Sequence, residues 1–167
     1  GAECARRFHA LGARVWGTTR SGAPVDGVDR LIPLDELVDA VAHVDAIVVT
    51  LPGTDQTRHL IDAEILRAAR PGVIVASVGR GTVIDETALL AALEDGTVSF
   101  AAMDVFEVEP LPVDSPLWAH PRVLVSPHTA ALSSREEERI ARRFAEDATR
   151  LLDGVPTRAV VDTVEFY

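Results

Sequence analysis

Three polar residues with complementary chemistry follow short apolar segments of this sequence. Arg80 stands between two glycines, Glu109 directly precedes a proline, and His128 directly follows one. Each apolar segment is typical of a buried strand, and open α/β folds bind ligands where the carboxyl ends of parallel strands meet. An arginine can clamp a carboxylate, an imidazole can move a proton to or from oxygen, and a carboxylate can keep that imidazole oriented and charged. The sequence therefore predicts a site for a carbonyl substrate that carries a carboxylate.

Structural interpretations compete with these catalytic ones. Glu109 lies in an acidic run with Asp104 and Glu107, and such a run is also typical of a solvated surface, so Glu107 is the local competitor for the catalytic carboxylate. The glycines beside Arg80 allow close approach of the backbone to a ligand and positive φ angles, which an ordinary surface arginine does not need. The segment Ser126-Pro127-His128 directly follows a predicted strand, and the proline stiffens the chain before His128. The other histidines are interpreted as surface or satisfied core residues: His9, His43, His59 and His120.

The elements that must position these residues alternate between helix and strand, a pattern that predicts parallel β-α-β units. The predicted strands are residues 13–18, 46–51, 73–77, 100–103 and 123–125. The predicted helices are residues 2–11, residues 34–41, a segment with Ile65, Leu66 and Ala69, residues 86–95, and a final segment with Ile140, Phe144, Ala148 and Leu151 on one face. The expected fold class is therefore α/β with a parallel sheet.

The ends of several helices carry recognisable capping residues. Asp62 and Asp85 are placed to cap the N-termini of two helices, and Gly96 is placed to end the second of them. Ser133 and Ser134 each stand three residues before a glutamate, which predicts capping boxes for the final helix.

Composition excludes several classes of protein. The chain has 167 residues, the size of one domain, with 47% hydrophobic and 25% charged residues, so disorder is not expected. Its formal charge is 16 − 26 = −10, which repels phosphate backbones and anionic lipid, so neither nucleic acid nor a membrane is an expected partner. The single Cys4 cannot form an internal disulfide and is expected to be a small buried residue, no metal site is expected, and the predicted location is cytoplasmic.

Three motifs, in their order, resemble the NAD(P)-binding domain of the D-isomer-specific 2-hydroxyacid dehydrogenases. They are the segments 78–85, 104–110 and 126–128, and the resemblance extends over nearly the whole chain. It implies a Rossmann-like, doubly wound parallel sheet and hydride transfer between a nicotinamide cofactor and a D-2-hydroxy acid or 2-oxo acid. It further implies that Arg80 binds the substrate carboxylate, that His128 is the acid/base, and that Glu109 is the partner of His128.

The same resemblance assigns residues to the cofactor. Asp104 is similar to the aspartate that binds the nicotinamide carboxamide, and Val78 follows the neighbouring strand. The segment 50–57 is similar to a loop beside the adenosine half of the cofactor, with Leu51, Pro52 and Thr57 as its binding residues. The sequence departs from the family pattern at two positions: Gly53 replaces a leucine, and Ser77 stands where asparagine is common.

The identity of the cofactor depends on the residues after the second strand of the fold. An acidic residue there would bind the ribose 2′-hydroxyl, but the sequence has Thr19 followed by Arg20. A positive charge next to hydroxyl donors suits a 2′-phosphate, although an exposed loop arginine is the competing interpretation. NADP or NAD is therefore the expected cofactor, with NADP favoured.

The resemblance also predicts how the domain is organised. Gly1 corresponds to the third glycine of G-x-G-x-x-G, so the first strand, most of the glycine-rich turn and the family's substrate domain fall outside this sequence. The expected organisation is one N-terminally truncated dinucleotide-binding domain, residues 1–167, with residues 158–167 reaching toward the substrate domain. A chain that lacks these parts is expected not to catalyse by itself.

Alternatives remain within this reading. Glyoxylate/hydroxypyruvate reductases and phosphoglycerate dehydrogenases are branches of the family, and much of the substrate choice resides in the substrate domain. A cofactor-sensing binding protein, like the corepressors that share the fold, is the alternative from another class. The full-length protein is expected to be a homodimer that takes a small 2-oxo or 2-hydroxy acid.

Overall fold

The protein is described from a computed structural model, which describes residues 1–158 and residue 160. The chain divides into two compact units, one formed by residues 1–128 and one that begins at Thr129. The expectation that residues 158–167 reach toward the substrate domain concerns residues that mostly lie outside the described part of the chain. Among the described residues, every helix is too short or too polar to cross a membrane.

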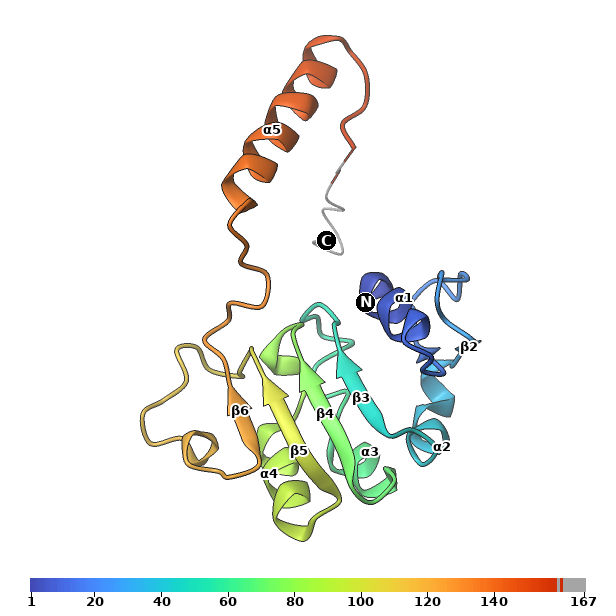
Figure 1. The fold of residues 1–167 in the computed structure, drawn as a ribbon, viewed down its shortest axis with the longest axis vertical. Helices are drawn as coiled ribbons and strands as arrows, with labels where there is room; N and C mark the ends of the chain where they lie inside the picture. Colours follow the sequence, from blue (N-terminus) through green and yellow to red (C-terminus); the bar gives the residue numbers. More distant parts are fainter. Residues whose placement is uncertain (159, 161–167) are drawn as a thin grey trace. The chain divides into compact units, whose positions relative to one another are not determined.

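The first unit alternates helices and strands along the chain (Figure 1). Its elements are α1 (Ala2–Ala10), β1 (Trp16–Gly17), β2 (Arg30–Leu31), the 3-10 turn η1 (Leu34–Glu36), α2 (Leu37–Val41), β3 (Ala46–Val49), α3 (Ala63–Ala68), β4 (Val73–Ser77), η2 (Gly81–Val83), α4 (Glu86–Asp95), β5 (Val98–Met103), η3 (Pro116–Trp118) and β6 (Val123–Val125). The second unit contains α5 (Glu136–Leu152).

All strand pairs are parallel, as the alternating pattern predicts. Strands β3, β4, β5 and β6 form one sheet in that order, and β1 pairs with β2 in a second, two-stranded sheet. The register places Val49, Ser77, Met103 and Val125 in one row at the carboxyl ends of the four strands. The predicted α/β class is confirmed, and the segments that follow these strands leave the sheet from a common edge.

Two parts of the sequence-based prediction differ from the structure. The strand predicted over residues 13–18 is reduced to the two residues of β1, and its partner β2 was not predicted. Both strands are too short to show a period-2 pattern, and β2 begins with an exposed arginine. Residues 34–41 form η1 followed by α2 in place of a single helix.

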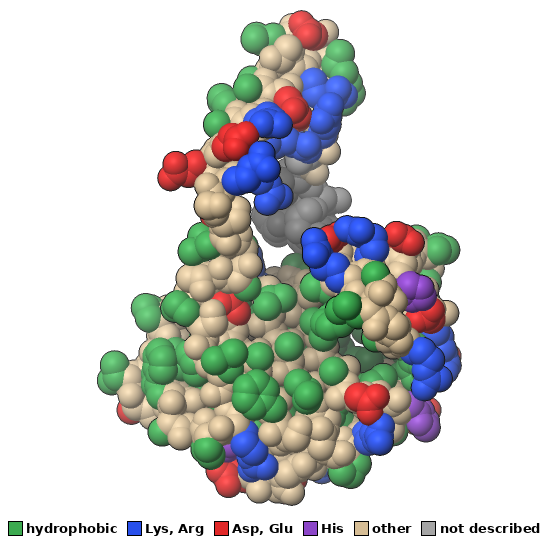
Figure 2. All heavy atoms as spheres, in the orientation of Figure 1, with side chains coloured by type: hydrophobic (Ala, Val, Ile, Leu, Met, Phe, Trp, Pro, Cys, Tyr) green, Lys and Arg blue, Asp and Glu red, His purple; other side chains and the backbone are tan. Residues whose placement is uncertain are grey.

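The hydrophobic core lies on one face of the four-stranded sheet, against α2, α3 and α4. Alternation along β4 shows this, since Val73 and Val75 are buried and Ile74 between them is 44% exposed. The opposite face carries exposed Val48, Phe100 and Leu124 together with Ile74. Figure 2 shows hydrophobic side chains gathered over this face.

Two of the predicted caps are present, and the capping boxes are wrong. The Asp62 carboxylate accepts hydrogen bonds from Glu64 N and Ile65 N at 2.8 and 3.0 Å, and Asp85 accepts from Ala88 N at 3.0 Å. At the final helix, α5 begins only at Glu136, after Arg135. Ser133 Oγ accepts from Arg135 N at 3.3 Å, so this serine closes a turn before the helix and caps no helical N–H.

Further features concern helix ends and faces. Gly96 ends α4 in the left-handed conformation with φ of 84°, as predicted. The predicted apolar stripe of α5 exists, and its large members Ile140, Phe144 and Leu151 are all exposed. Cys4 is a free thiol that is half-buried, so the expectation of full burial is wrong.

Candidate active site

The parallel hydrogen-bond pattern continues past the carboxyl ends of the strands. Val78 N donates to Val49 O at 3.0 Å, and Ser126 N donates to Met103 O at 2.9 Å. Asp104 N donates to Ser77 O at 3.0 Å in the same way. Because each segment leaves the sheet bonded to its neighbour, the segments that carry Arg80, Glu109 and His128 start side by side.

The turn that carries Arg80 is wedged between two neighbouring loops. A Cβ atom at Gly79 would lie 2.4 Å from Leu51 O, and one at Gly81 would lie 1.8 Å from Phe106 C, so only glycine fits at either position. Neither glycine has a positive φ angle. The two glycines therefore allow close approach of protein backbone, and the expectation that they provide positive φ is wrong.

Arg80 and Glu109 border the same open hollow of about 340 Å³, a size suited to a small acid. The remaining residues around this hollow are Gly53, Gly81, Thr82, Phe106 and Glu107. Arg80 is exposed, and its Nη1 donates to Gly79 O at 2.8 Å. This bond anchors one edge of the guanidinium at the strand end. A carboxylate in the hollow would meet this positive charge at its border.

Glu109 contacts His128 directly. The Glu109 Oε2 atom lies 2.7 Å from Nδ1 of His128, and Glu109 Oε1 accepts a hydrogen bond from Phe106 N at 3.0 Å. Burial acts to raise the pKa of Glu109, but the Phe106 N–H and the His128 ring together lower that pKa below its usual range. Glu109 is therefore a carboxylate at neutral pH. With Nδ1 turned to this anion, Nε2 is the His128 nitrogen that remains for a substrate.

The backbone of His128 has a left-handed conformation, with φ of 55°. A non-glycine residue in this region costs free energy and persists where the surroundings hold it, most often at functional sites. The strand β6 ends three residues earlier, so the ring is held at the carboxyl edge of the sheet.

The structure brings several of the expected cofactor residues to this edge. Gly1 precedes the first turn of α1, and a Cβ atom there would lie 2.9 Å from Thr50 Oγ1, so the N-terminus of α1 adjoins the carboxyl end of β3. Asp104 is buried and accepts a hydrogen bond from Ser126 Oγ at 2.5 Å. Val78 is 45% exposed at the end of β4.

The other expected cofactor residues differ in how they are held. Thr57 closes the loop 52–57 by hydrogen bonds, because its hydroxyl donates to Pro52 O at 2.7 Å and accepts from Thr54 N at 2.9 Å. Leu51 and Pro52 in that loop are half-buried. Thr19 follows β1 by two residues, and its buried Oγ1 has no hydrogen-bond partner among the described residues. Arg20, the next residue, is exposed.

Ser77 shows the consequence of one departure from the family pattern. Its side chain is fully buried at the end of β4, and its hydroxyl has no hydrogen-bond partner in the described structure. The backbone of Ser77 nevertheless pairs normally with β3 and β5. The missing side-chain bond therefore leaves the strand that leads to Arg80 in register.

The sequence analysis named both His59 and Glu107 but did not predict that they contact each other at this edge. The structure places Nε2 of His59 3.1 Å from Oε2 of Glu107, and Glu107 borders the hollow beside Arg80. A signal for Glu107 was available, because residues 107 and 109 are two apart and would share one face of an extended segment. No comparable signal pointed to His59.

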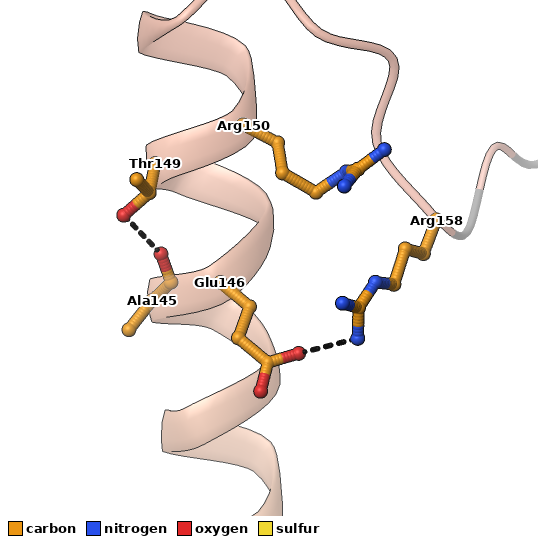
Figure 3. Close-up of a pocket in the computed structure, with 5 residues that line it drawn as sticks. All are labelled: Ala145, Glu146, Thr149, Arg150 and Arg158. Atoms are coloured by element: carbon orange, nitrogen blue, oxygen red, sulfur yellow. Dashed lines mark hydrogen bonds and ion pairs between the residues drawn. The ribbon is translucent and has the colours of Figure 1, made fainter.

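A second hollow lies on α5 and is lined by Ala145, Glu146, Thr149, Arg150 and Arg158 (Figure 3). Its charged groups are engaged with each other or with backbone: Arg158 Nη1 lies 2.9 Å from Glu146 Oε2, and Arg150 Nε donates to Pro156 O at 2.7 Å. It has no imidazole and does not carry the expected chemistry. Within the described residues, no group of three or more His, Cys, Asp or Glu side chains could hold a metal ion.

Comparison with known proteins identifies the family. Residues 1–130 match the profile described as "D-isomer specific 2-hydroxyacid dehydrogenase, NAD binding domain". The chain belongs to this family. The resemblance carried by the three motifs is thereby confirmed, and the parallel sheet with its flanking helices is the Rossmann-like fold of this NAD binding domain.

Relatives within the D-2-hydroxyacid dehydrogenases match along the entire chain. The glyoxylate/hydroxypyruvate reductase A of Salmonella choleraesuis is 36% identical over 171 residues, which covers 100% of this chain and 53% of that protein. A D-isomer specific 2-hydroxyacid dehydrogenase from Xanthobacter autotrophicus, solved with NADPH and MES, has a TM-score of 0.91 and 39% identity, covering 100% of this chain and 68% of the other.

A third match is the NADPH-dependent glyoxylate/hydroxypyruvate reductase of Sinorhizobium meliloti, solved with NADP and sulfate. It has a TM-score of 0.91 and 30% identity, covering 100% of this chain and 54% of the other. The chain thus spans about half the length of the curated relatives that it matches. The family has a nicotinamide dinucleotide as its cofactor, and two of these solved relatives hold the phosphorylated form.

Proposed function

We propose that this chain is the cofactor domain of an NAD(P)H-dependent enzyme that interconverts small 2-oxo acids and D-2-hydroxy acids. One observation carries the proposal: Arg80 and Glu109 border one hollow, and Glu109 holds the ring of His128 at 2.7 Å. The names of the relatives favour glyoxylate and hydroxypyruvate as substrates.

Each of the three side chains has a separate task in this reaction. The Arg80 guanidinium binds the carboxylate of the 2-oxo acid through two parallel hydrogen bonds and so fixes the position of the neighbouring carbonyl group. His128 Nε2 donates a proton to the carbonyl oxygen as the carbonyl carbon is reduced, and takes that proton back in the oxidation direction. Glu109, ionised at neutral pH, holds the ring in place and stabilises its positive charge.

The residues on this edge fit a nicotinamide dinucleotide, which when bound supplies or accepts the hydride. The first-turn N–H groups of α1, beside Thr50, would bind the pyrophosphate. Thr19, with its buried and unpartnered hydroxyl, and Arg20 would bind the 2′ position of the adenosine ribose. The remaining assignments place Leu51, Pro52 and Thr57 beside the adenosine half and Val78 and Asp104 beside the nicotinamide.

A turnover assay on the protein that the gene encodes tests this proposal. We expect oxidation of NADPH with glyoxylate, hydroxypyruvate or pyruvate, measured by the loss of absorbance at about 340 nm. Chiral chromatography should show D-configured products from hydroxypyruvate and pyruvate, whose reduced carbon is a stereocentre. The carboxylate is required by the Arg80 assignment, so the matching aldehydes without a carboxylate should be poor substrates. Absence of turnover with every 2-oxo acid, in folded protein that binds the cofactor, would contradict the proposed activity.

The preference for NADP over NAD rests on Thr19 and Arg20. We expect Arg20→Ala to weaken NADPH binding about 10- to 100-fold, because a charged hydrogen bond to the 2′-phosphate is lost. NADH binding should hardly change, since NADH lacks that phosphate. Calorimetric titration of both cofactors measures the difference, and Arg67→Ala, at an exposed position of α3, is the control. A wild-type protein that prefers NADH, or equal losses for both cofactors, would refute the preference.

Homodimerisation of the full-length protein and a cytoplasmic location stay predictions. So does the choice between the reductase and phosphoglycerate dehydrogenase branches of the family. A phosphorylated 2-oxo acid, assayed beside the three substrates above, separates these branches.

A further inference from the structure

A second histidine–carboxylate pair lies beside Arg80, and the proposed reaction does not use it. His59 Nε2 is 3.1 Å from Glu107 Oε2, and the two side chains are 34% and 25% exposed. The atoms are at ion-pair distance, but His59 Nε2 lacks the alignment of a hydrogen bond. Glu107 lies two residues before Glu109 and borders the same hollow as Arg80.

Glu107 is also tied to the first turn of α4 by two reciprocal hydrogen bonds. Its Oε1 accepts from Glu86 N at 3.0 Å, and its own backbone N donates to Glu86 Oε1 at 2.6 Å. Burial raises the pKa of Glu86, while the hydrogen bond from Glu107 N acts to lower that pKa. The first N–H groups of a helix have no partner within the helix, so Glu107 satisfies one that would otherwise be unpaired. The segment of Glu109 is thus fastened to α4.

His59 is in turn fastened to the turn that follows Arg80. Its backbone N donates to Thr82 O at 2.8 Å, and the chain continues with Ile61 N donating to Val83 O at 3.0 Å. His59 has a left-handed backbone with φ of 49°. Within the described residues, His59 and His128 are the only non-glycine residues with positive φ. Each therefore stands in a conformation that its surroundings must hold, and each faces a glutamate.

These contacts join three segments: the segment of His59, the Arg80 turn with the start of α4, and the segment of Glu109. Glu107 belongs to the segment of Glu109, and its side chain contacts the other two segments, at Glu86 and at His59. Both of its oxygens are engaged away from His128, one with Glu86 N and one with His59. Glu109 instead faces His128. Glu107 can therefore influence the reaction through the position of its neighbours.

We propose that Glu107 is a positioning residue for the site, which clamps the segment of Glu109 to the Arg80 turn through Glu86 and His59. This assignment rests on the proposed function for its effect on turnover, but its effect on Glu109 is independent of any activity. Without the Glu107 side-chain contacts, residues 107–109 can shift against the Arg80 turn, and the Glu109 carboxylate is no longer held at a fixed distance from His128. A misplacement of about 1 Å can reduce a rate by about 10²-fold.

The test compares Glu107→Ala with Glu107→Gln in the protein that the gene encodes. Glutamine keeps an oxygen that accepts from Glu86 N. Alanine removes both contacts of the Glu107 side chain and leaves the bond from Glu107 N to Glu86 Oε1. The matched control is Glu94→Ala, because Glu94 also faces a histidine, His120, at 3.7 Å and lies near the other end of α4. Four quantities are measured for each variant: kcat, KM, cofactor affinity, and the titration of the Glu109 carboxyl by ¹³C NMR.

We expect Glu107→Ala to lower kcat about 10- to 100-fold, with KM and cofactor affinity within about threefold of the wild type. The pKa of Glu109 should rise toward its ordinary value, because the displaced carboxylate loses the His128 ring, one of the groups that lower this pKa. Glu107→Gln should restore most of kcat and the wild-type titration of Glu109. The control should match the wild type throughout.

Two outcomes would contradict the proposed positioning role of Glu107. An unchanged Glu109 titration in Glu107→Ala does so even if the variant is less stable, because Glu107 would then be only structural. Equal losses in the alanine and glutamine variants would also do so, because they would show that charge, and not position, is what Glu107 contributes. If the wild type reduces no 2-oxo acid, the proposed function fails, and the Glu109 titration still decides the clamp.

Discussion

Replacement of His128 by glutamine should lower kcat about 10²- to 10⁴-fold, the effect typical of losing a positioned proton donor. Glutamine is close to histidine in size and retains a hydrogen-bonding group near Glu109, but it cannot exchange a proton. Cofactor affinity should stay near that of the wild type, because no proposed cofactor contact involves this ring. Steady-state kinetics with hydroxypyruvate and calorimetry with NADPH measure the two effects separately.

The pH dependence gives the same substitution a second readout. Reduction takes a proton from the ring, so the wild-type rate should depend on pH. The residual rate of His128→Gln should lack this dependence. His9→Gln is the control, since His9 is exposed at the end of α1 and faces Asp29 at 3.3 Å. Near-normal turnover in His128→Gln would remove this residue from the mechanism.

Replacement of Arg80 by glutamine should lower kcat/KM about 10²- to 10³-fold, because two charge-assisted hydrogen bonds to the substrate carboxylate are lost. Arg80→Lys keeps the positive charge and loses the planar fork, so its rate should lie between those of the wild type and the glutamine variant. Both variants should fold, since Arg80 is exposed and its only described side-chain bond is to Gly79 O.

The kinetic signature separates substrate binding from cofactor binding. Cofactor affinity in both Arg80 variants should match the wild type, and saturation with the 2-oxo acid should require much higher concentrations. Arg67→Gln on α3 is a control for the loss of one surface positive charge. If kcat/KM in Arg80→Gln stays within about threefold of the wild type, another group must bind the carboxylate.

Several elements could be predicted with their observed bounds because local chemistry specifies them. Strand β4 is a continuous apolar run, and α4 lies between the capping Asp85 and the left-handed Gly96. The same kind of local rule predicted capping boxes for α5, and that prediction is wrong. A serine three residues before a glutamate is a pattern in sequence, but Ser133 closes a turn before the helix instead.

The residue types of the candidate site could be predicted as well, but their partners could not. Residues 107 and 109 are both glutamates in one acidic run, and it is the path of the chain after β5 that turns Glu109 to His128 and Glu107 to Glu86 and His59. These contacts join residues that are about 20 to 50 positions apart in the chain. Periodicity and capping rules describe neighbours along the chain and contain no information on such pairs.

By itself, the sequence determined the α/β class, the order of most elements, and an arginine, a carboxylate and an imidazole at the carboxyl ends of three strands. These are local properties, set by apolar runs, caps and glycines. The tertiary structure alone decided that Gly79 and Gly81 must be glycine, because the Arg80 turn is pressed against Leu51 and Phe106. It also decided that His59 faces Glu107, which borders the hollow beside Arg80. Parallel register brings distant segments within hydrogen-bond distance, and only a folded sheet has a register.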